Sequence, residues 1–540
     1  MVKNFRLEGV TVAALDYYKK HLKHIYWLFS LVLCVSLFVA TKFSYTNSDD
    51  AWYAMVGRGI AEGNIMLKGW IGSSMSHYFP YGLVEAFWSL FIHKYRDVHA
   101  LSIISLSILL FAVMWLTLKI LLGKNPRMFS LLTMAAIVAA MEPCVLSDSF
   151  AHLAPLIPTL LTTCLYYGSR KDRWVNYLIA FLIACWSDAY CLAYFFIPLI
   201  GENVLFFLKT RKVDYHLGWV ILGVAIYLVR SALMTKLGIG MFINVQDINL
   251  NTMGRFKQIC WITPLEHLGL RVLNIYREFS HMYSAYLWNK MVIRALPNLY
   301  FTMLMLISLW LHHSYFREIC EEKKFPEKHR FMVFLLISSL FIYALLFFTV
   351  VPIWHRYISG PFLNGLIMLA YWLNVKFDSD GELGVISLMT LLFSLLVQIN
   401  DGRYRMDQRL IDRRKMAAII RQENLHGGYA WFGNVQSMNF ILNEQKIAIV
   451  RGCPCTLWEW EIDKKTFCQD KFDFVLSPID ARNNAMGWEN WECENSSDVL
   501  KQFGIPKKTV DVGSIRLYIY DDITGVLEPA RLCSGISKNK

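Results

Sequence analysis

Charged residues are scarce in this sequence of 540 residues: Asp, Glu, Lys and Arg together make up 18%, whereas apolar residues make up 55%. Soluble domains carry about 25% charged residues, so the scarcity excludes an ordinary soluble protein and indicates a polytopic membrane protein. The net charge is +12, but the basic residues cluster in short loops between apolar runs. Positive-inside orientation explains this excess, and we expect no nucleic-acid partner.

Several catalytic and binding motifs are also missing. The C-P-C at 453–455 is not a CxxC pair and has no histidine at a zinc-like spacing. The C-terminal part contains no P-loop, no dinucleotide fingerprint and no nucleophile pair. The basic N-terminus leads into an apolar run without an Ala-x-Ala cleavage site, so we interpret that run as a retained helix rather than a signal peptide.

What the sequence does contain is a series of apolar runs, each close to the ~20 residues that cross a bilayer. They predict about eleven crossings, of which 174–186 and 362–375 are the shortest. The runs are 25–41, 99–122, 128–147, 150–168, 174–186, 189–208, 217–234, 297–313, 331–350, 362–375 and 383–399.

The loops between these runs predict the orientation. Alternate loops are basic, while the loops at 142–148 and 187–190 contain no Lys or Arg. The positive-inside rule therefore places the N-terminus inside and the segment 46–64 outside. Because the predicted number of crossings is odd, the tail after Ile399 is expected outside as well. The arginine-rich segment 401–422 argues against this, but long segments translocate largely regardless of charge.

Two domains follow. Residues 1–399 form a transmembrane helical domain with two long outer loops, 42–98 and 235–293. Residues 400–540 form a small α/β domain outside the membrane, because short β-prone segments there alternate with turn formers. The expected strands are 427–433, 446–450, 472–476 and 514–520.

The outer loop 42–98 contains the first candidate site. Asp49 and Asp50 follow the first apolar run and precede Trp52 and Tyr53. Such carboxylates often mark a helix end simply because charge is costly in the bilayer, by roughly 2.5–3.5 kcal/mol. A carboxylate at a membrane face can equally act as a general base, and arginine can stabilise a phosphate leaving group.

Two motifs resemble the GT-C superfamily of membrane glycosyltransferases. They are the acidic pair in AspAspAlaTrpTyr (49–53), followed by GlyArgGlyIleAlaGluGlyAsn (57–64), and TrpHisArgTyrIleSerGlyPro (354–361). The architecture with an outer C-terminal domain is most similar to the serotype-converting O-antigen glucosyltransferases. The resemblance implies a polyprenyl-phosphate-linked sugar donor, a lipid-linked glycan acceptor and contact with membrane lipids.

Residue roles also follow from the resemblance. Asp50 is our choice of general base; Asp49 is the alternative, or an N-cap for a helix beginning near Ala51. Arg356, with His355 and Tyr357, is our choice for holding the donor phosphate, unless its side chain merely snorkels to the interface. Arg58 is a second phosphate candidate.

A second acidic or acceptor site is expected at Glu142 and Asp148. Asp148 is instead a possible cap for a helix starting at Phe150. A divalent metal held by Asp50, Glu142 and Asp148 is an alternative, but the sequence has no DxD triplet or dense carboxylate cluster. We therefore assign no required cofactor and no metal site.

These observations predict a multi-pass protein of the bacterial inner membrane whose active site and C-terminal domain face the periplasm. The predicted activity is transfer of a hexose, preferably glucose, from undecaprenyl phosphate to a lipid-linked O-antigen or similar surface glycan. The alternatives are transfer of another sugar to lipid A, teichoic acid or protein, and a lipid-linked glycan transporter or flippase. A transporter is expected to show internal repeats, which this sequence lacks.

Overall fold

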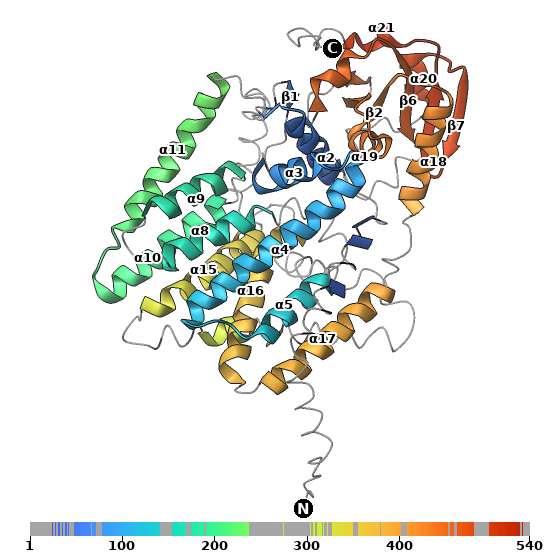
Figure 1. Cartoon of the computed structure of the whole chain (residues 1–540). Helices are drawn as coiled ribbons and strands as arrows, with labels where there is room; N and C mark the ends of the chain where they lie inside the picture. Colours follow the sequence, from blue (N-terminus) through green and yellow to red (C-terminus); the bar gives the residue numbers. More distant parts are fainter. Residues whose placement is uncertain are drawn as a thin grey trace, which may run out of the picture.

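The computed structural model combines a helical bundle with a smaller mixed α/β domain (Figure 1). It describes a defined set of segments, together with the short stretches 69–71 and 310–315 and scattered single positions. The segments are 48–65, 78–140, 154–168, 174–187, 191–236, 327–348, 355–377, 380–400, 408–451, 454–457, 462–479 and 496–529.

The bundle helices correspond to the predicted apolar runs from residue 99 onward, apart from 297–313, most of which lies outside the described residues. The predicted runs begin or end within a few residues of most of these helices. They are α4 (Tyr95–Leu122), α5 (Met128–Ala140), α8 (Leu156–Gly168), α9 (Trp174–Ser187), α10 (Ile197–Thr210), α11 (His216–Lys236), α15 (Glu327–Phe348), α16 (His355–Lys376) and α17 (Asp380–Asn400).

The outer surface of the bundle is apolar. Two described helices, Tyr95–Leu122 and His329–Phe348, are long and apolar enough to cross a membrane, so the eleven predicted crossings stay a prediction. Large apolar patches on a protein surface indicate contact with lipid or with a partner. Exposed bundle residues of this kind include Ile108, Leu109, Val175, Ile179, Ile200, Val204, Phe207, Ile221, Leu222, Val229, Leu340, Val385, Leu388, Leu392 and Leu396.

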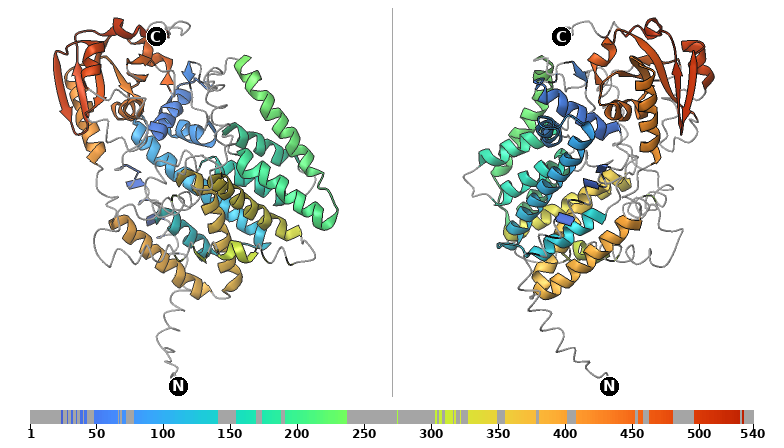
Figure 2. Two further views of the ribbon diagram at one scale, coloured as in Figure 1. Left: turned by 180° about the vertical axis from the view of Figure 1, so that it is seen from behind. Right: turned by 45° about the vertical axis from the view of Figure 1, so that its right-hand side comes forward.

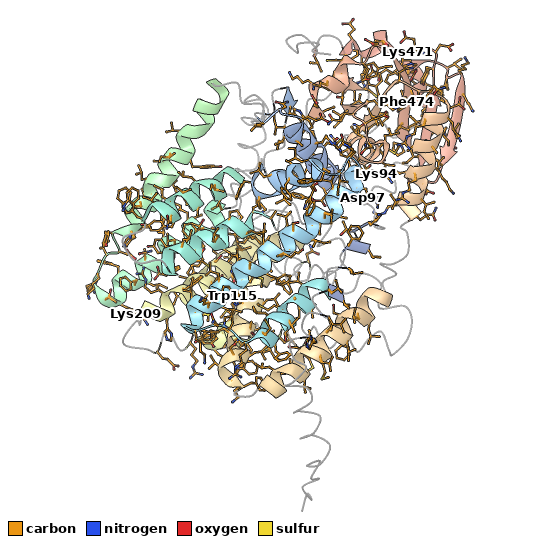
Figure 3. The ribbon with its side chains drawn as sticks, in the orientation of Figure 1. Lys94, Asp97, Trp115, Lys209, Lys471 and Phe474 are labelled. Carbon is orange, nitrogen blue, oxygen red and sulfur yellow. The ribbon has the colours of Figure 1, made fainter. Side chains whose placement is uncertain are left out.

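The length of α4 matches a bilayer. Asp97 near its start and Lys119 near its end are about 33 Å apart at 1.5 Å per residue, close to the ~30 Å of a hydrocarbon core. Figure 3 places Lys94 and Asp97 at the end of the bundle that faces the α/β domain, and Lys209 at the opposite end. The apolar layer therefore lies between two charged ends.

A buried ion cluster joins three helices and the connection between α10 and α11 near the Lys209 end. Arg330 on α15 makes a bidentate contact with Glu202 on α10, at 2.6 and 2.9 Å. It also reaches Asp214, between α10 and α11, at 2.8 Å. Tyr167 at the end of α8 donates to Glu202 at 3.2 Å. Glu202 has no exposed surface, so this cluster supplies the paired partners that a buried charge requires.

The C-terminal domain contains the expected strands within a six-stranded mixed sheet of order β4-β3-β2-β6-β8-β7. Strand β2 (Gly427–Trp431) runs parallel to both β3 (Ile447–Arg451) and β6 (Phe472–Pro478). Three antiparallel strands complete the sheet, namely β4 (Thr456–Leu457), β7 (Lys508–Val512) and β8 (Ile515–Ile519). Four described α-helices accompany it: α18 (Gln408–Gln422), α19 (Phe432–Leu442), α20 (Ser496–Phe503) and the short α21 (Thr524–Leu527).

The described part of the segment 42–98 lies between the bundle and this sheet. It forms α2 (Ser48–Ala61), the short strand β1 (Trp70–Ile71) and α3 (Leu83–Ser89). Both views in Figure 2 show α2 and α3 at the end of α4 that faces the C-terminal domain. This loop and the C-terminal domain therefore lie at the same end of the bundle. The second predicted outer loop, 235–293, lies almost entirely outside the described residues.

Candidate active site

A buried chain of polar side chains begins at Asp50. The Tyr81 hydroxyl donates to Asp50 Oδ1 at 2.9 Å and lies 3.3 Å from His99 Nδ1. That nitrogen is also 3.1 Å from Glu85 Oε1. Asp50, Tyr81 and Glu85 have no exposed surface, and His99 is 1% exposed. We call these four residues the Asp50 cluster.

The cluster is assembled from α2, the π-helical turn Tyr78–Gly82, α3 and α4. Asp50 lies in the first turn of α2, Tyr81 directly precedes α3, Glu85 lies on α3, and His99 lies on the second turn of α4. Aromatic packing fixes the face of α2: Tyr53 contacts Tyr81 with ring centroids 5.0 Å apart, and Trp52 contacts Trp70 at the same separation. The two aromatics that follow the acidic pair therefore serve as core residues that orient Asp50.

Burial raises the pKa of two members of the cluster, Glu85 and Tyr81. It raises the pKa of Glu85 above its ordinary value, and the hydrogen bond from His99 opposes this rise. Burial and the neighbouring Asp50 charge raise the pKa of Tyr81 well above its usual range. Tyr81 therefore stays protonated, and its hydroxyl donates a hydrogen bond to Asp50. His99 lies between two carboxyl groups and links Glu85, through Tyr81, to Asp50. Such a chain can accept, hold and pass on a proton.

Gly57 permits the close approach of α2 and α3. A Cβ at Gly57 would lie 2.4 Å from Glu85 Cβ and 2.7 Å from the Glu85 carbonyl carbon. We expect Gly57→Ala to push α3 and Glu85 away and to cost roughly 1–3 kcal/mol of stability by overpacking, visible as a lower thermal midpoint in detergent. Gly218→Ala in α11 is the matched control, because nothing lies within 4 Å of its added Cβ. A lowered midpoint in both variants would contradict the argument.

The C-terminal domain joins the loop through backbone pairing. Strand β1 pairs antiparallel with β5 (Ile462–Asp463), with Trp70 opposite Asp463 and Ile71 opposite Ile462. The Lys464 amide donates to the Gly69 carbonyl at 2.8 Å. Residues far along the chain thus pair with the strand that carries Trp70, which packs on Trp52 of α2, and this contact cannot be read from local sequence.

Asp463 makes this joint sensitive to pH. Burial raises its pKa from 3.8 to about 6, the backbone and charge of Lys465 oppose the rise, and the Glu62 carboxylate adds to it. A raised carboxyl pKa means that the ionised form destabilises the folded state, so the cost is absent below pH 4 and complete above pH 6. We expect Asp463→Asn to raise stability at pH 7.5 by roughly 1–3 kcal/mol and to have little effect at pH 4. Thermal midpoints at both pH values test this, and equal effects at both would contradict it.

The structure describes only some of the other predicted site residues. Asp49 lies in α2, but its side chain is not among the described ones. Because α2 begins at Ser48, Asp49 lies inside the first turn, and the N-cap interpretation is wrong. Arg58 donates to the backbone oxygens of Ile92 and His93, at 3.1 and 2.5 Å. In this structure Arg58 therefore fixes the connection between α3 and α4.

His355, Arg356 and Tyr357 form the first turn of α16, but their side chains lie outside the described set. Glu142 and Asp148 lie outside the described residues altogether. Within the described part of the chain, no three His, Cys, Asp or Glu side chains gather as a metal site would require. The second acidic site and the metal alternative therefore stay predictions.

Sequence reasoning missed Tyr81, Glu85 and His99. The sequence alone assigns a role to none of the three. A signal was nevertheless present, because Glu85 and His99 lie in and just after the same outer loop as Asp50. His99 also stands at the very start of an apolar run, where a titratable side chain faces the loop.

Two of the solved structures that this chain resembles are forms of one protein. The crystal structure of ArnT from Cupriavidus metallidurans in the apo state matches with 12% identity and a TM-score of 0.48, covering 79% of this chain and 86% of that one. The same protein bound to undecaprenyl phosphate matches with 11% identity and a TM-score of 0.46, covering 78% and 85%. No family model matches the sequence, and no curated protein matches it.

Proposed function

We propose that this chain is an integral membrane glycosyltransferase. It moves a hexose, for which glucose is our choice, from undecaprenyl phosphate to a lipid-linked O-antigen or similar surface glycan. The observation that carries the proposal is the Asp50 cluster: a carboxylate held by Tyr81 and backed by His99 and Glu85. It lies where an apolar bundle meets a polar domain. A lipid-borne sugar and a glycan acceptor can meet only at such a boundary.

The proposed reaction is a direct inverting displacement. The acceptor hydroxyl oxygen forms a bond to the anomeric carbon while the bond from that carbon to the carrier phosphate oxygen breaks. The electron pair leaves with the phosphate, and the hydroxyl proton passes to Asp50. Tyr81 orients Asp50 through its hydrogen bond, and the proton can be shared onward through His99 and Glu85.

The carrier phosphate needs a cation as its negative charge develops. We assign this role to Arg356 in the first turn of α16, with His355 and Tyr357 beside it, because a guanidinium can hold phosphate through two parallel hydrogen bonds. Arg58 is no longer our choice, since its donors already serve the connection between α3 and α4. Glu142 and Asp148 stay candidates for positioning the acceptor.

A periplasmic location of the site is part of the proposal. The cluster and the C-terminal domain lie at the same end of the bundle, as the alternation of basic loops predicts. Cys468 in that domain is disulfide-bonded, and disulfides persist mainly in oxidising compartments such as the periplasm. Both observations support placing the active site outside the cytosol.

The experiment that tests the function uses the purified full chain in liposomes. It is supplied with undecaprenyl-phosphate-linked glucose and a lipid-linked glycan, and the glycan is analysed by mass spectrometry. We expect a product heavier by one hexose residue, together with released undecaprenyl phosphate. Movement of the lipid-linked glycan across the liposome membrane without any change in its mass would instead favour a flippase and overturn the proposal.

A further inference from the structure

One ring nitrogen of the Asp50 cluster has no hydrogen-bond partner. His99 Nε2 is buried, and no donor or acceptor among the described residues reaches it. The other ring nitrogen already contacts Tyr81 and Glu85. Leaving a buried polar atom unsatisfied costs roughly 1–3 kcal/mol, and such an atom in a native structure calls for an explanation. Binding of a ligand in another state of the protein would provide one.

The residue packed against His99 comes from the C-terminal domain. The Phe440 ring on α19 meets the imidazole edge-on, with centroids 5.9 Å apart and the planes at 88°. Phe440 also stacks on Tyr95 at the start of α4. It is 2% exposed and belongs to the apolar core of the bundle, whereas Met438 and Leu442, its neighbours on α19, belong to the core of the C-terminal domain. Phe440 thus reaches out of its own domain to close the site.

The polar part of the joint that holds Phe440 in place is small, although α19 also packs against α2. It includes the hydrogen bond from the Tyr95 amide to Asn443 Oδ1 at 2.9 Å and the one from the Lys464 amide to the Gly69 carbonyl at 2.8 Å. Its sheet component is the two-residue pairing of β1 with β5. A two-stranded pair of this length is marginal by itself in water. Opening the joint therefore requires Phe440 to leave the bundle core and α19 to separate from α2, while the core of the C-terminal domain stays intact.

We propose that α19 is a removable cover of the Asp50 cluster, and that the hydroxyl-bearing acceptor takes the place of Phe440 when the cover opens. The inference rests on the proposed function. One acceptor hydroxyl faces Asp50 and loses its proton, while a neighbouring hydroxyl donates to His99 Nε2. This makes His99 an acceptor-binding residue. It also explains how the carboxylate can be fully buried in this state and still react.

A reversible lock tests the cover. Ile71 and Ile462 are directly opposite in the antiparallel pair, where Cα atoms are about 4.5–5.5 Å apart, within the range for a disulfide. In the Ile71→Cys/Ile462→Cys double variant of the full chain, oxidation should hold the cover closed. Diethyl pyrocarbonate, which acylates accessible neutral imidazoles, then reports on His99 by peptide mass spectrometry.

We expect oxidation of the double variant to slow His99 modification at least tenfold, and reduction to restore it. Phe440→Ala should speed modification without any cross-link. The two single-cysteine variants, treated in parallel, control for effects of oxidant and reductant on the native cysteines. His426, whose side chain is 61% exposed, provides an internal control that should react equally in every sample.

Equal His99 modification in the locked and reduced forms would overturn the cover, as would a His99 that stays unreactive in both. Sugar transfer is measured on the same samples and should fall at least tenfold on locking. Transfer that survives the lock while His99 is protected would overturn the acceptor role of His99. A wild-type chain that transfers no sugar would defeat the proposed function, while His99 modification would still decide whether α19 is a cover.

Discussion

Replacing Asp50 with asparagine is expected to lower the rate of sugar transfer at least 100-fold, because a general base in the transition state contributes roughly 10²–10⁴. The substitution changes little else. The Tyr81 hydroxyl donates a hydrogen bond to Asp50 Oδ1 at 2.9 Å. An asparagine Oδ1 at this position can still accept that hydrogen bond. The variant should therefore fold, bind its substrates and show an unchanged KM with a much lower kcat. Steady-state transfer in liposomes measures both constants.

Asp49→Asn is the matched control, because it removes the same charge one residue away on the same helix turn. We expect its kcat to stay within about threefold of the wild type, and a thermal midpoint for each variant separates chemical from structural loss. Wild-type activity in a well-folded Asp50→Asn protein would remove Asp50 from the mechanism. Loss of activity in Asp49→Asn alone would transfer the role to its neighbour.

Tyr81→Phe provides an intermediate case. It deletes the hydroxyl that holds Asp50 and links it to His99, at 2.9 and 3.3 Å, but it keeps the ring that packs on Tyr53. If the cluster acts as a proton chain, the loss should fall between those of Asp50→Asn and Asp49→Asn. This ordering of three variants is a stricter test than any one of them.

The sequence predicted the helices and strands well because their signals are local. Apolar runs of near-bilayer length correspond to α4, α5, α8 to α11 and α15 to α17. Alternating or continuous β-prone residues between turn formers became β2, β3, β6 and β8. The helix α16 illustrates the limit: the apolar run begins at Phe362, but the helix begins at His355, because polar residues continue a helix without contributing to its apolar run.

Of the four residues in the Asp50 cluster, sequence reasoning named only Asp50 as a candidate. Asp50 stood out as a carboxylate beside a membrane run, which is a signal carried by a few adjacent residues. Its partners could not be predicted in the same way, because Tyr81, Glu85 and His99 meet Asp50 only through the packing of three helices. The missing side chain of Gly57 permits this packing. A glycine in a helix can have many other causes, so Gly57 could not reveal the packing from the sequence. Phe440 is separated from His99 by more than 300 residues, so no local pattern could connect them.

Long-range charge pairing was equally invisible in the sequence. Asp214 and Arg330 were both in predicted loops or at their edges, where charges are usually solvated, and Glu202 lay inside a predicted crossing. The structure brings these residues together in one buried cluster. A carboxylate in an apolar run calls for a partner, and only the arrangement of the helices shows that the partner is an arginine more than 100 residues away.

Arg330→Met is expected to destabilise the bundle by roughly 3–5 kcal/mol, since it leaves the fully buried Glu202 carboxylate without its cation. Methionine keeps much of the side-chain length and apolar stem, so the loss reports on charge rather than on volume. The centroid of the Phe206 ring lies 4.1 Å from the guanidinium carbon of Arg330. In the variant this ring keeps an apolar neighbour, the methionine. Thermal unfolding in detergent, followed by protease resistance, measures the effect.

Arg317→Met is the control. Arg317 pairs with Glu321 one helical turn away, and the two side chains are 72% and 64% exposed, so the loss should stay below about 0.5 kcal/mol. Adding Glu202→Gln to Arg330→Met should recover much of the lost stability, because the uncompensated charge is then gone. If Arg330→Met and Arg317→Met lowered the midpoint equally, the buried cluster would not stabilise the helices that it joins. Because this cluster lies at the end of the bundle away from Asp50, its variants should affect folding without changing the KM of the protein that does fold.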